Sequence, residues 1–251
     1  GLFDMGGEDS HGSSTQEPDL VETTPWGVKE RLTFEKTAVG FYLSGHLFDE
    51  VTREVRQFVK RPIDELIDSR EPQLLAGIIS DFRVINGQRG KLALFKLDDK
   101  SAVIEATADE AVINTYRNLL KDDELVIVMG KLQPDRFSGG FRLSVNQVWD
   151  LATARCRFGK FLRMRINRNG LEGGAALPVL ERLYRDFPAK REVSEQGELL
   201  RGLGIRFSLV FPDFVAEDKL RVDETKFFPT DAALASLMAQ AYEGQASIVY
   251  D

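Results

Sequence analysis

Two short groups of cationic, amide and aromatic residues have the side chains in this sequence best suited to bind a partner. Arginine and lysine form ion pairs with phosphate groups, and flat aromatic rings stack on nucleic-acid bases. Each group surrounds glycines, whose small size lets a backbone approach a ligand closely. The residues are Arg83, Asn86, Gln88, Arg89, Lys91 and Phe95 in the first group and Arg136, Phe137 and Arg142 in the second. Together they predict contact with a nucleic-acid strand, although each one singly also fits a solvated loop or a core aromatic.

The elements that must position these residues lie between residues 74 and 149. Alternating apolar runs recur there, and turn signals such as Asn86-Gly87 and Asp98-Asp99-Lys100 close them. The predicted order is strand, strand, strand, helix, strand, strand, which is typical of the OB-fold barrel. That barrel binds oligonucleotides near the loop between its first two strands and the loop between its last two. Both groups fall in these loops, and the alternation of Phe95 with Leu94 predicts that Phe95 lies on the open face. Single-stranded nucleic acid is therefore the predicted ligand.

Catalysis and metal binding are not predicted for this chain. The carboxylates of Asp98-Asp99 and Asp122-Asp123-Glu124 fall at expected turns, where aspartate commonly bonds the local backbone. Two histidines and one cysteine argue against a structural zinc site, and no cofactor motif is found. The single Cys156 fits a reducing cytoplasm and reads as an ordinary thiol whose pKa neighbouring arginines could lower.

The charge of the chain is unevenly distributed. The formal net charge is −7, and the first 24 residues carry six acids and no Lys or Arg. This composition predicts a disordered tail. A small apolar cluster at its start, formed by Leu2, Phe3, Asp4 and Met5, is of the kind that docks into a partner's pocket, although it fits a segment without a role equally well. The stretch from Arg155 to Arg168 is the clearest candidate for a local basic surface.

The segments that flank the barrel predict a chain of several parts. Helices are predicted over 26–44 and 49–59, with a short helical turn over 63–67 that follows Pro62. After the barrel, the order strand, helix, strand, strand, helix, strand suggests a ferredoxin-like module, and Thr230 is predicted to cap its second helix. The predicted fold class is α+β and multi-domain. The predicted parts are an acidic tail (1–25), a helical linker (26–72), an OB-fold barrel (73–152) and a ferredoxin-like α/β module (153–251).

Three stretches of sequence resemble one protein family. They are Glu35-Lys36 followed by GFYLSGH at 40–46, RGKLALFKLDDKSAVIEA at 89–106, and the end of the chain from Lys226. This set resembles the C-terminal region of bacterial replicative DNA polymerase III alpha subunits, and it is most similar to proteobacterial members. The likeness runs from Glu35 to Asp251. It departs from the family at Leu47, where proline is usual, at Ala102, where glycine is usual, and at Ala108, where an aromatic is common.

The resemblance implies a role for each part. The catalytic aspartates of the family would lie upstream, so this chain would be a non-catalytic fragment of a cytoplasmic, nucleoid-associated replisome enzyme. The barrel would guide single-stranded template DNA. Leu2 and Phe3, with Asp4 and Met5, match the apolar end of the motif that binds the beta sliding clamp. The C-terminal module would bind the tau subunit of the clamp loader.

Exposed aromatic and arginine residues commonly anchor protein interfaces. This places the tau surface at Phe161, Arg163 and Arg165, or near Phe227 and Phe228 beside the last helix, with packing between domains as the alternative for these residues. Two other functions fit the barrel pattern. One is an OB-type module that binds tRNA anticodons. The other is a protein-only interaction scaffold, in keeping with the acidic pI of about 5.1.

Overall fold

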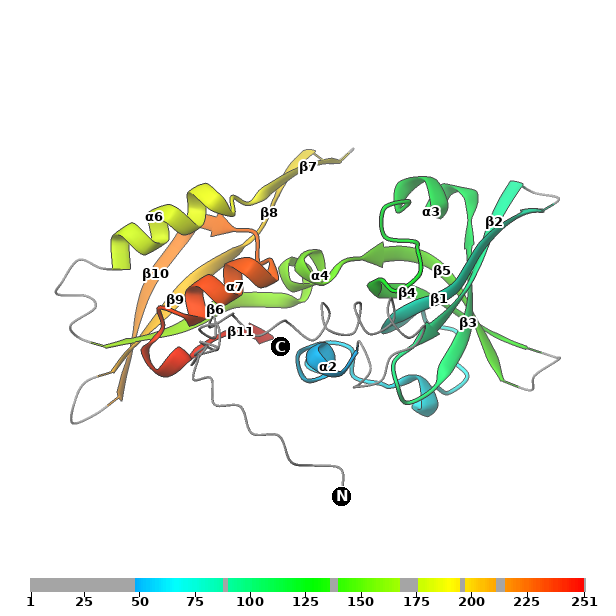
Figure 1. The fold of residues 1–251 in the computed structure, drawn as a ribbon, viewed down its shortest axis with the longest axis horizontal. Helices are drawn as coiled ribbons and strands as arrows, with labels where there is room; N and C mark the ends of the chain where they lie inside the picture. The colour runs from blue at the N-terminus through cyan, green and yellow to red at the C-terminus, as the bar shows by residue number, and fades with distance from the viewer. Residues whose placement is uncertain are drawn as a thin grey trace, which may run out of the picture.

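The computed structural model describes residues 48–87, 90–135, 140–167, 176–194, 197–210 and 215–250. Within these ranges the chain forms two sheet-based bodies, a barrel and an α/β module, and short helices lie between them (Figure 1). The predicted α+β fold class is confirmed. The predicted helix over 26–44 and the acidic tail lie outside the described residues.

The first body is the predicted OB-fold barrel. Its strands pair in the closed order β1-β2-β3-β5-β4, with a parallel pairing only between β3 and β5. The bounds are β1 Gln73–Gly87, β2 Gly90–Asp98, β3 Val103–Asp109, α3 Glu110–Thr115, β4 Leu125–Pro134 and β5 Phe141–Trp149. Asp109 caps α3 by accepting the N–H of Val112 at 2.9 Å, which ends β3 and starts the helix.

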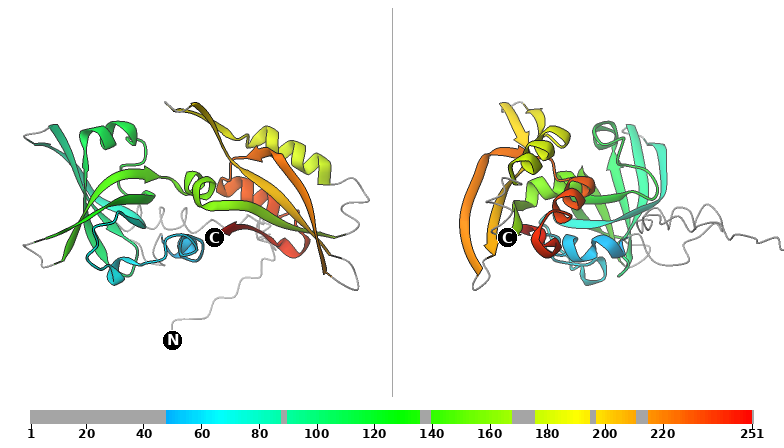
Figure 2. Two further views of the ribbon diagram at one scale, coloured as in Figure 1. Left: turned by 180° about the vertical axis from the view of Figure 1, so that it is seen from behind. Right: turned by 60° about the vertical axis from the view of Figure 1, so that its left-hand side comes forward.

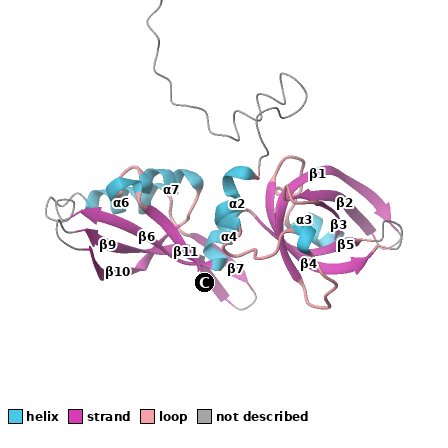
Figure 3. Cartoon of the chain, turned by 90° about the horizontal axis from the view of Figure 1, so that it is seen from below, coloured by secondary structure: helices cyan, strands magenta, loops and turns pink. Residues whose placement is uncertain are grey.

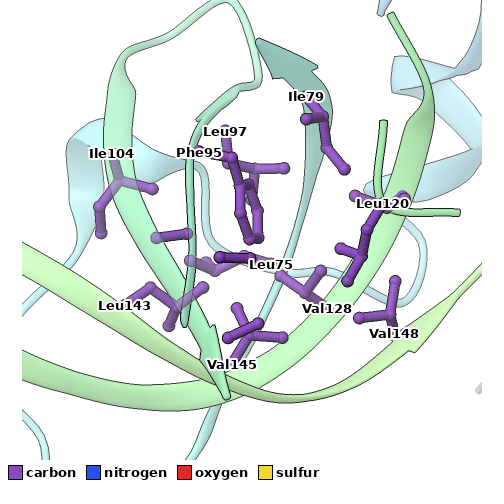
Figure 4. Packing of buried hydrophobic residues seen from close by; sticks show 14 of the residues in the cluster. Leu75, Ile79, Phe95, Leu97, Ile104, Leu120, Val128, Leu143, Val145 and Val148 are labelled. Carbon is purple, nitrogen blue, oxygen red and sulfur yellow. The ribbon is translucent and has the colours of Figure 1, made fainter. Parts of the chain in front are cut away.

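Apolar side chains at alternate positions of the strands fill the inside of the barrel. Phe95 and Leu97 of β2 are buried and point inward, where they meet residues of the other strands (Figure 4). Ala93 of the same strand is buried in this core as well. The wall is tight at Gly130, where a Cβ atom would lie 2.4 Å from the carbonyl oxygen of Ser144. A side chain at position 130 would therefore push β4 and β5 apart.

A β-bulge interrupts β1 between Ser80 and Arg83. Asp81 adopts a left-handed backbone with φ of 54°, a conformation that aspartate tolerates better than most residues. The displaced N–H of Phe82 donates to the Oδ1 of Asp122 at 2.9 Å. The bulge turns the Phe82 ring toward Phe95, 6.4 Å away between centroids, and leaves Asp81 exposed beside Lys96.

Short helices cover one side of the barrel. They are α2 (Asp49–Val55), η1 (Ile63–Glu65) and α4 (Leu151–Phe158). Apolar residues of α2 and α4 pack on β1, β4 and β5 around Ile127 and Trp149. The described part of the predicted linker thus packs on the barrel, and α2 ends four residues earlier than predicted. The helix α4 was not predicted from the sequence. Asp150 caps it by accepting the N–H of Thr153 at 2.7 Å.

Asp99 ties the covering segment to the barrel. Its carboxylate is buried, and it accepts the N–H groups of Ile63, Ser101 and Ala102 and an ion pair from Arg56. These donors hold the pKa of Asp99 below its ordinary value, although burial acts in the opposite direction and is the largest single influence. The turn role predicted for this carboxylate is confirmed.

The second body is a four-stranded sheet in the order β10-β9-β6-β11, with α6 and α7 on one face (Figures 2 and 3). The predicted Thr230 cap of α7 is confirmed, because its hydroxyl accepts the N–H of Ala233 at 3.1 Å. The bounds are β6 Gly159–Asn167, α6 Ala176–Asp186, β7 Lys190–Ser194, β8 Gly197–Arg201, β9 Leu203–Val210, β10 Val215–Phe227, α7 Asp231–Met238, η2 Tyr242–Gly244 and β11 Ala246–Tyr250.

The strand arrangement of this body differs from the ferredoxin-like one. In a split βαβ unit another strand lies between the two parallel strands, whereas β6 and β9 pair directly here. The β7–β8 hairpin is an addition that was not predicted from the sequence. The ferredoxin-like description therefore applies to the order of the elements and not to their pairing.

Candidate nucleic-acid interface

A concave groove of about 330 Å³ lies on the outer surface of the barrel, where the bulged part of β1 meets β2, β3 and β5. The groove is polar for most of its extent. Its polar lining residues are Asp81, Arg83, Lys96, Glu105, Thr107 and Arg142.

Strand register explains why charged side chains meet in this groove. Glu105 of β3 pairs with Lys96 of β2 on one side and with Arg142 of β5 on the other. Directly paired residues project from the same face of a sheet, so these three side chains share the outer face. Inward-facing neighbours such as Ala106 and Leu143 are buried in the core. Polar side chains on the outer face thus alternate with the apolar side chains that pack inside the barrel.

Two ion pairs lie within the groove. The Nζ of Lys96 is 2.7 Å from the Oδ2 of Asp81, and the Nη2 of Arg142 is 2.8 Å from the Oε2 of Glu105. The hydrogen bond from Lys96 and then its charge lower the pKa of Asp81, and the same bond raises the pKa of Lys96. Both groups are therefore charged near neutral pH. Arg83 also lines the groove and makes no ion pair with any residue that the structure describes.

The structure brings together part of the predicted set. Arg83 and Arg142 line the groove, whereas Asn86 and Lys91 pair with each other and are exposed at the far end of the β1–β2 hairpin. The backbone N–H of Lys91 donates to Glu110 at 3.3 Å. Gln88, Arg89, Arg136 and Phe137 lie outside the described residues.

The prediction that Phe95 lies on the open face is wrong. Its side chain is 3% exposed and points into the barrel core (Figure 4). Period-two alternation on β2 is as predicted, but Leu94 and Lys96 occupy the outer face, because a shift of one residue exchanges the two faces of a strand. Lys96 was the residue missed, together with Asp81, Glu105 and Thr107. The alternation itself contained the signal for Lys96, Glu105 and Thr107, and only the bulge explains Asp81.

The residues proposed for a protein interface divide into two sets. Phe161, Arg163 and Arg165 alternate with Leu162, Met164 and Ile166, which are buried against α6 and α7. Phe161, Arg163 and Arg165 therefore lie on the face of the sheet that no described helix covers, called here the helix-free face. The guanidinium of Arg206 lies 3.7 Å from the centroid of Phe161, and that of Arg163 lies 6.0 Å from it.

Phe227 and Phe228 form the second set, and they are not exposed. Their side chains are 0% and 4% exposed, and the N–H of Phe228 donates to the carbonyl of Phe187 at 2.9 Å. The premise that they offer exposed aromatic surface is wrong, because the segment before α7 packs them inward. The Leu2–Met5 cluster lies outside the described residues.

The predicted basic surface is interrupted at its start. Arg155 is 4% exposed, and its guanidinium contacts Glu54 and Asp231. Burial raises the pKa of the neighbouring Cys156 thiol to about 11, so the expected lowering by arginines is wrong. Arg157 lies over the Trp149 ring at 4.9 Å. Glu54, which neutralises Arg155, is 101 residues away in sequence and could not be identified as its partner from the local pattern.

Comparison with known proteins identifies a family model, curated relatives and a solved structure. Residues 74–151 match the family model tRNA_anti-codon, described as an OB-fold nucleic acid binding domain. The DNA polymerase III subunit alpha of Pseudomonas aeruginosa is 40% identical over 147 residues, which is 58% of this chain and 12% of that protein. That of Neisseria meningitidis serogroup B is 35% identical over 168 residues, 66% of this chain and 14% of that protein.

The chain thus spans less than a sixth of the length of these relatives. Among solved structures, the second OB-fold domain of replication protein A from Methanococcus maripaludis matches with a TM-score of 0.29 and 16% identity, over 36% of this chain and 93% of that one. Within the described part of the chain, no helix has the length and apolar character needed to cross a membrane.

Proposed function

Over more than half of its length the chain belongs to the family of bacterial DNA polymerase III alpha subunits, and we propose that it acts within such a subunit as a non-catalytic module that guides single-stranded template DNA. In this proposal, residues outside the chain carry out nucleotide transfer, and the chain works in the cytoplasm as part of the replisome. No cofactor enters the proposed role.

One observation carries the proposal. The groove places Arg83, Lys96 and Arg142 on the face of a closed OB-type barrel that is used for oligonucleotides in this fold. Three cations at adjoining positions suit the backbone of a single strand, whose phosphates dominate its affinity for proteins. The matched family model covers all five strands of the barrel.

A salt titration tests this role. A labelled single-stranded DNA oligomer should bind the protein, and binding should weaken as salt rises. Arg83→Gln combined with Arg142→Gln should lower the affinity and reduce the slope of log K against log salt by roughly 0.7 for each phosphate that the protein no longer neutralises. Arg191→Gln, which removes a cation from the β7–β8 hairpin, serves as the matched control. Absence of binding at low salt would sink the proposal.

The proposal includes two protein contacts. Leu2 and Phe3, with Asp4 and Met5, would dock the beta sliding clamp. Replacing Leu2 and Phe3 with alanine should then abolish clamp binding measured by surface plasmon resonance, while binding of single-stranded DNA stays unchanged. Clamp binding that survives this double substitution would contradict the assignment.

The helix-free face of the C-terminal sheet would dock the tau subunit of the clamp loader. This face is defined by Phe161, Arg163, Arg165 and Arg206, and its support is a half-buried aromatic ring beside arginines. Arg163→Ala with Arg206→Ala should weaken capture of purified tau, whereas Arg185→Ala on α6, at the opposite face, should not. Equal capture by both variants would exclude this face.

A protein-only scaffold is the second candidate, and the barrel itself favours it in one respect. Each aromatic side chain described within the barrel strands packs against a core cluster, and none of these rings is fully exposed as a stacking platform. An OB-type module that binds tRNA anticodons differs in its ligand. In a competition assay, structured tRNA that displaces labelled single-stranded DNA more effectively than unlabelled DNA would favour that function instead.

A further inference from the structure

We infer that the barrel groove is a subsite for one backbone phosphate and that Asp81 and Glu105 compete with this phosphate for the cations. The inference rests on the proposed function, because the phosphate would belong to the bound single strand. The two carboxylates would then set how tightly the strand is held. They are the only acids that line the groove among the described residues.

Each carboxylate contacts one cation of the groove. Asp81 contacts Lys96 at 2.7 Å, and Glu105 contacts Arg142 at 2.8 Å. A carboxylate accepts hydrogen bonds from these donors through charged oxygens, much as a phosphate does. The two acids therefore accept from the same Lys96 and Arg142 donors that a phosphate of the strand would use.

A β-bulge in β1 sets the position of one of these acids. Asp81 lies in the β-bulge with a left-handed φ of 54°, which carries an energetic penalty for a residue other than glycine. A regular strand would direct this position differently, because the bulge inserts an extra residue opposite β2. The side chain that results faces Lys96 instead of pointing away from the groove.

Two donors in the groove remain for a ligand. Arg83 makes no ion pair with a described residue, and the Nε of Arg142 is buried without a hydrogen-bond partner. A buried donor without a partner is unfavourable, so a phosphate that reaches it gains more than an ordinary surface contact. A strand that enters the groove would meet Arg83 first as a charge and would then displace the two carboxylates.

The exchange is easy to reverse. All four side chains of the two ion pairs are substantially exposed, at 47% and 65% for Lys96 and Asp81 and at 41% and 57% for Arg142 and Glu105. Exposed ion pairs contribute little to stability, so the free-energy cost of breaking them is too small to keep the strand from binding. Once freed, the carboxylates repel the phosphates beside them and speed release. A groove built this way favours a strand that must keep moving.

Neutralising the acids tests the inference. The probe is a labelled thymidine oligomer, titrated by fluorescence anisotropy against the wild type, Asp81→Asn, Glu105→Gln and the double variant at low salt. Each single substitution should tighten binding about two- to fivefold, and the double variant should bind tighter still. Asparagine tolerates the left-handed backbone of position 81, so the fold should be kept, as thermal unfolding will verify.

Two controls separate competition from a general change in charge. Glu198→Gln removes an acid of the same kind from the Arg191 ion pair on the β7–β8 hairpin, and it should leave affinity unchanged. In addition, Arg142→Gln should weaken binding more in the Glu105→Gln background than in the wild type, because Glu105 no longer occupies that arginine. Additive effects of the two substitutions would overturn the competition.

The outcomes differ for the inference and for the proposed function. If the wild type binds and the neutralised variants match the Glu198→Gln control, or bind more weakly, the inference fails and the proposed function stands. If neither the wild type nor the double variant binds, both fail. If only the neutralised variants bind, the inference is supported, and the carboxylates account for the weakness of the wild type.

Discussion

Arg155 is a buried arginine whose guanidinium bonds to three other residues. Its Nε and Nη2 each lie 2.8 Å from a carboxylate oxygen of Glu54, and its Nη1 donates to the Pro229 carbonyl at 3.0 Å and to Asp231 at 2.6 Å. These partners hold the pKa of the guanidinium above its usual range although burial, the largest single influence, opposes this. A bidentate pair of this kind restricts geometry as well as charge.

Removing Arg155 should therefore destabilise the protein. Arg155→Gln leaves the partly buried Glu54 without its counter-charge, and we expect a loss of about 3 kcal/mol in the free energy of unfolding measured in urea. Arg191→Gln breaks an exposed pair and should change this quantity by less than about 1 kcal/mol. A similar small change for both variants would show that the buried network contributes no more than a surface pair.

Cys156 offers a second test at the residue scale. Because burial raises its pKa from 9.0 to about 11, the folded protein should carry about a hundredfold less thiolate near pH 8 than the unfolded chain. Its reaction with a thiol reagent should be correspondingly slow. The folded state favours the neutral thiol of Cys156, and this preference contributes to the free energy of unfolding. The contribution is complete below pH 9 and is lost as the pH rises toward 11. Equal reaction rates before and after denaturation would contradict the assigned burial.

Strands were the elements most open to prediction. The five barrel strands and α3 lie close to their predicted positions, because period-two alternation and turn residues such as Asn86-Gly87 are local signals. The face of a strand depends on register, which explains the error at Phe95. Pairing between distant strands has no local signal at all, so the direct β6–β9 pairing could not be told from a split arrangement.

Two elements were missed for separate physical reasons. The buried face of α4 includes an arginine, Arg155, so the segment resembled a basic surface and not a packed helix. The β7–β8 hairpin exposes Leu199 and Leu200, and it therefore lacks the apolar–polar alternation by which strands are recognised. In the barrel groove, Arg83 and Arg142 were predictable from loop chemistry. Asp81 was not, because its place depends on a bulge.

The cap of α7 is an element-scale prediction. Thr230→Ala removes the hydroxyl that accepts the N–H of Ala233, and we expect about 1 kcal/mol less stability in thermal or urea unfolding. Thr230→Ser keeps the acceptor and should behave nearly as the wild type. If the serine variant loses as much as the alanine variant, packing of the threonine methyl group, and not capping, would be the stabilising contact.

At the scale of the whole molecule, the barrel and the C-terminal sheet are joined by side chains from four elements. Glu54 of α2 meets Arg155 of α4, which meets Asp231 of α7, and the hydroxyl of Tyr250 in β11 donates to Glu54 at 2.5 Å. The Phe58 ring stacks on Phe158 at 5.2 Å and on Tyr250 at 5.1 Å. Charged and aromatic contacts thus fix one arrangement of the two bodies.

Loosening this joint should free the two bodies without unfolding either. Phe58→Ala with Tyr250→Phe removes both the stack and the hydroxyl contact, and the distance between dyes on β3 and β10 should become broader in single-molecule energy-transfer measurements. Val103→Ala, an exposed barrel position, should leave the distribution narrow. A narrow distribution in the double variant would mean that the remaining contacts, including those of Arg155, are enough to maintain the arrangement.

The hydroxyl of Tyr250 reaches back 196 residues to Glu54. A ribosome must therefore make residue 250 before this contact can form, long after the barrel strands have left the exit tunnel. Until then Glu54 lacks only the hydrogen bond from Tyr250, and the Phe58 ring lacks one of its two stacking partners. A transcript cut short just before this tyrosine would yield a chain whose two bodies lack this last contact, with the Phe58 ring missing its Tyr250 partner.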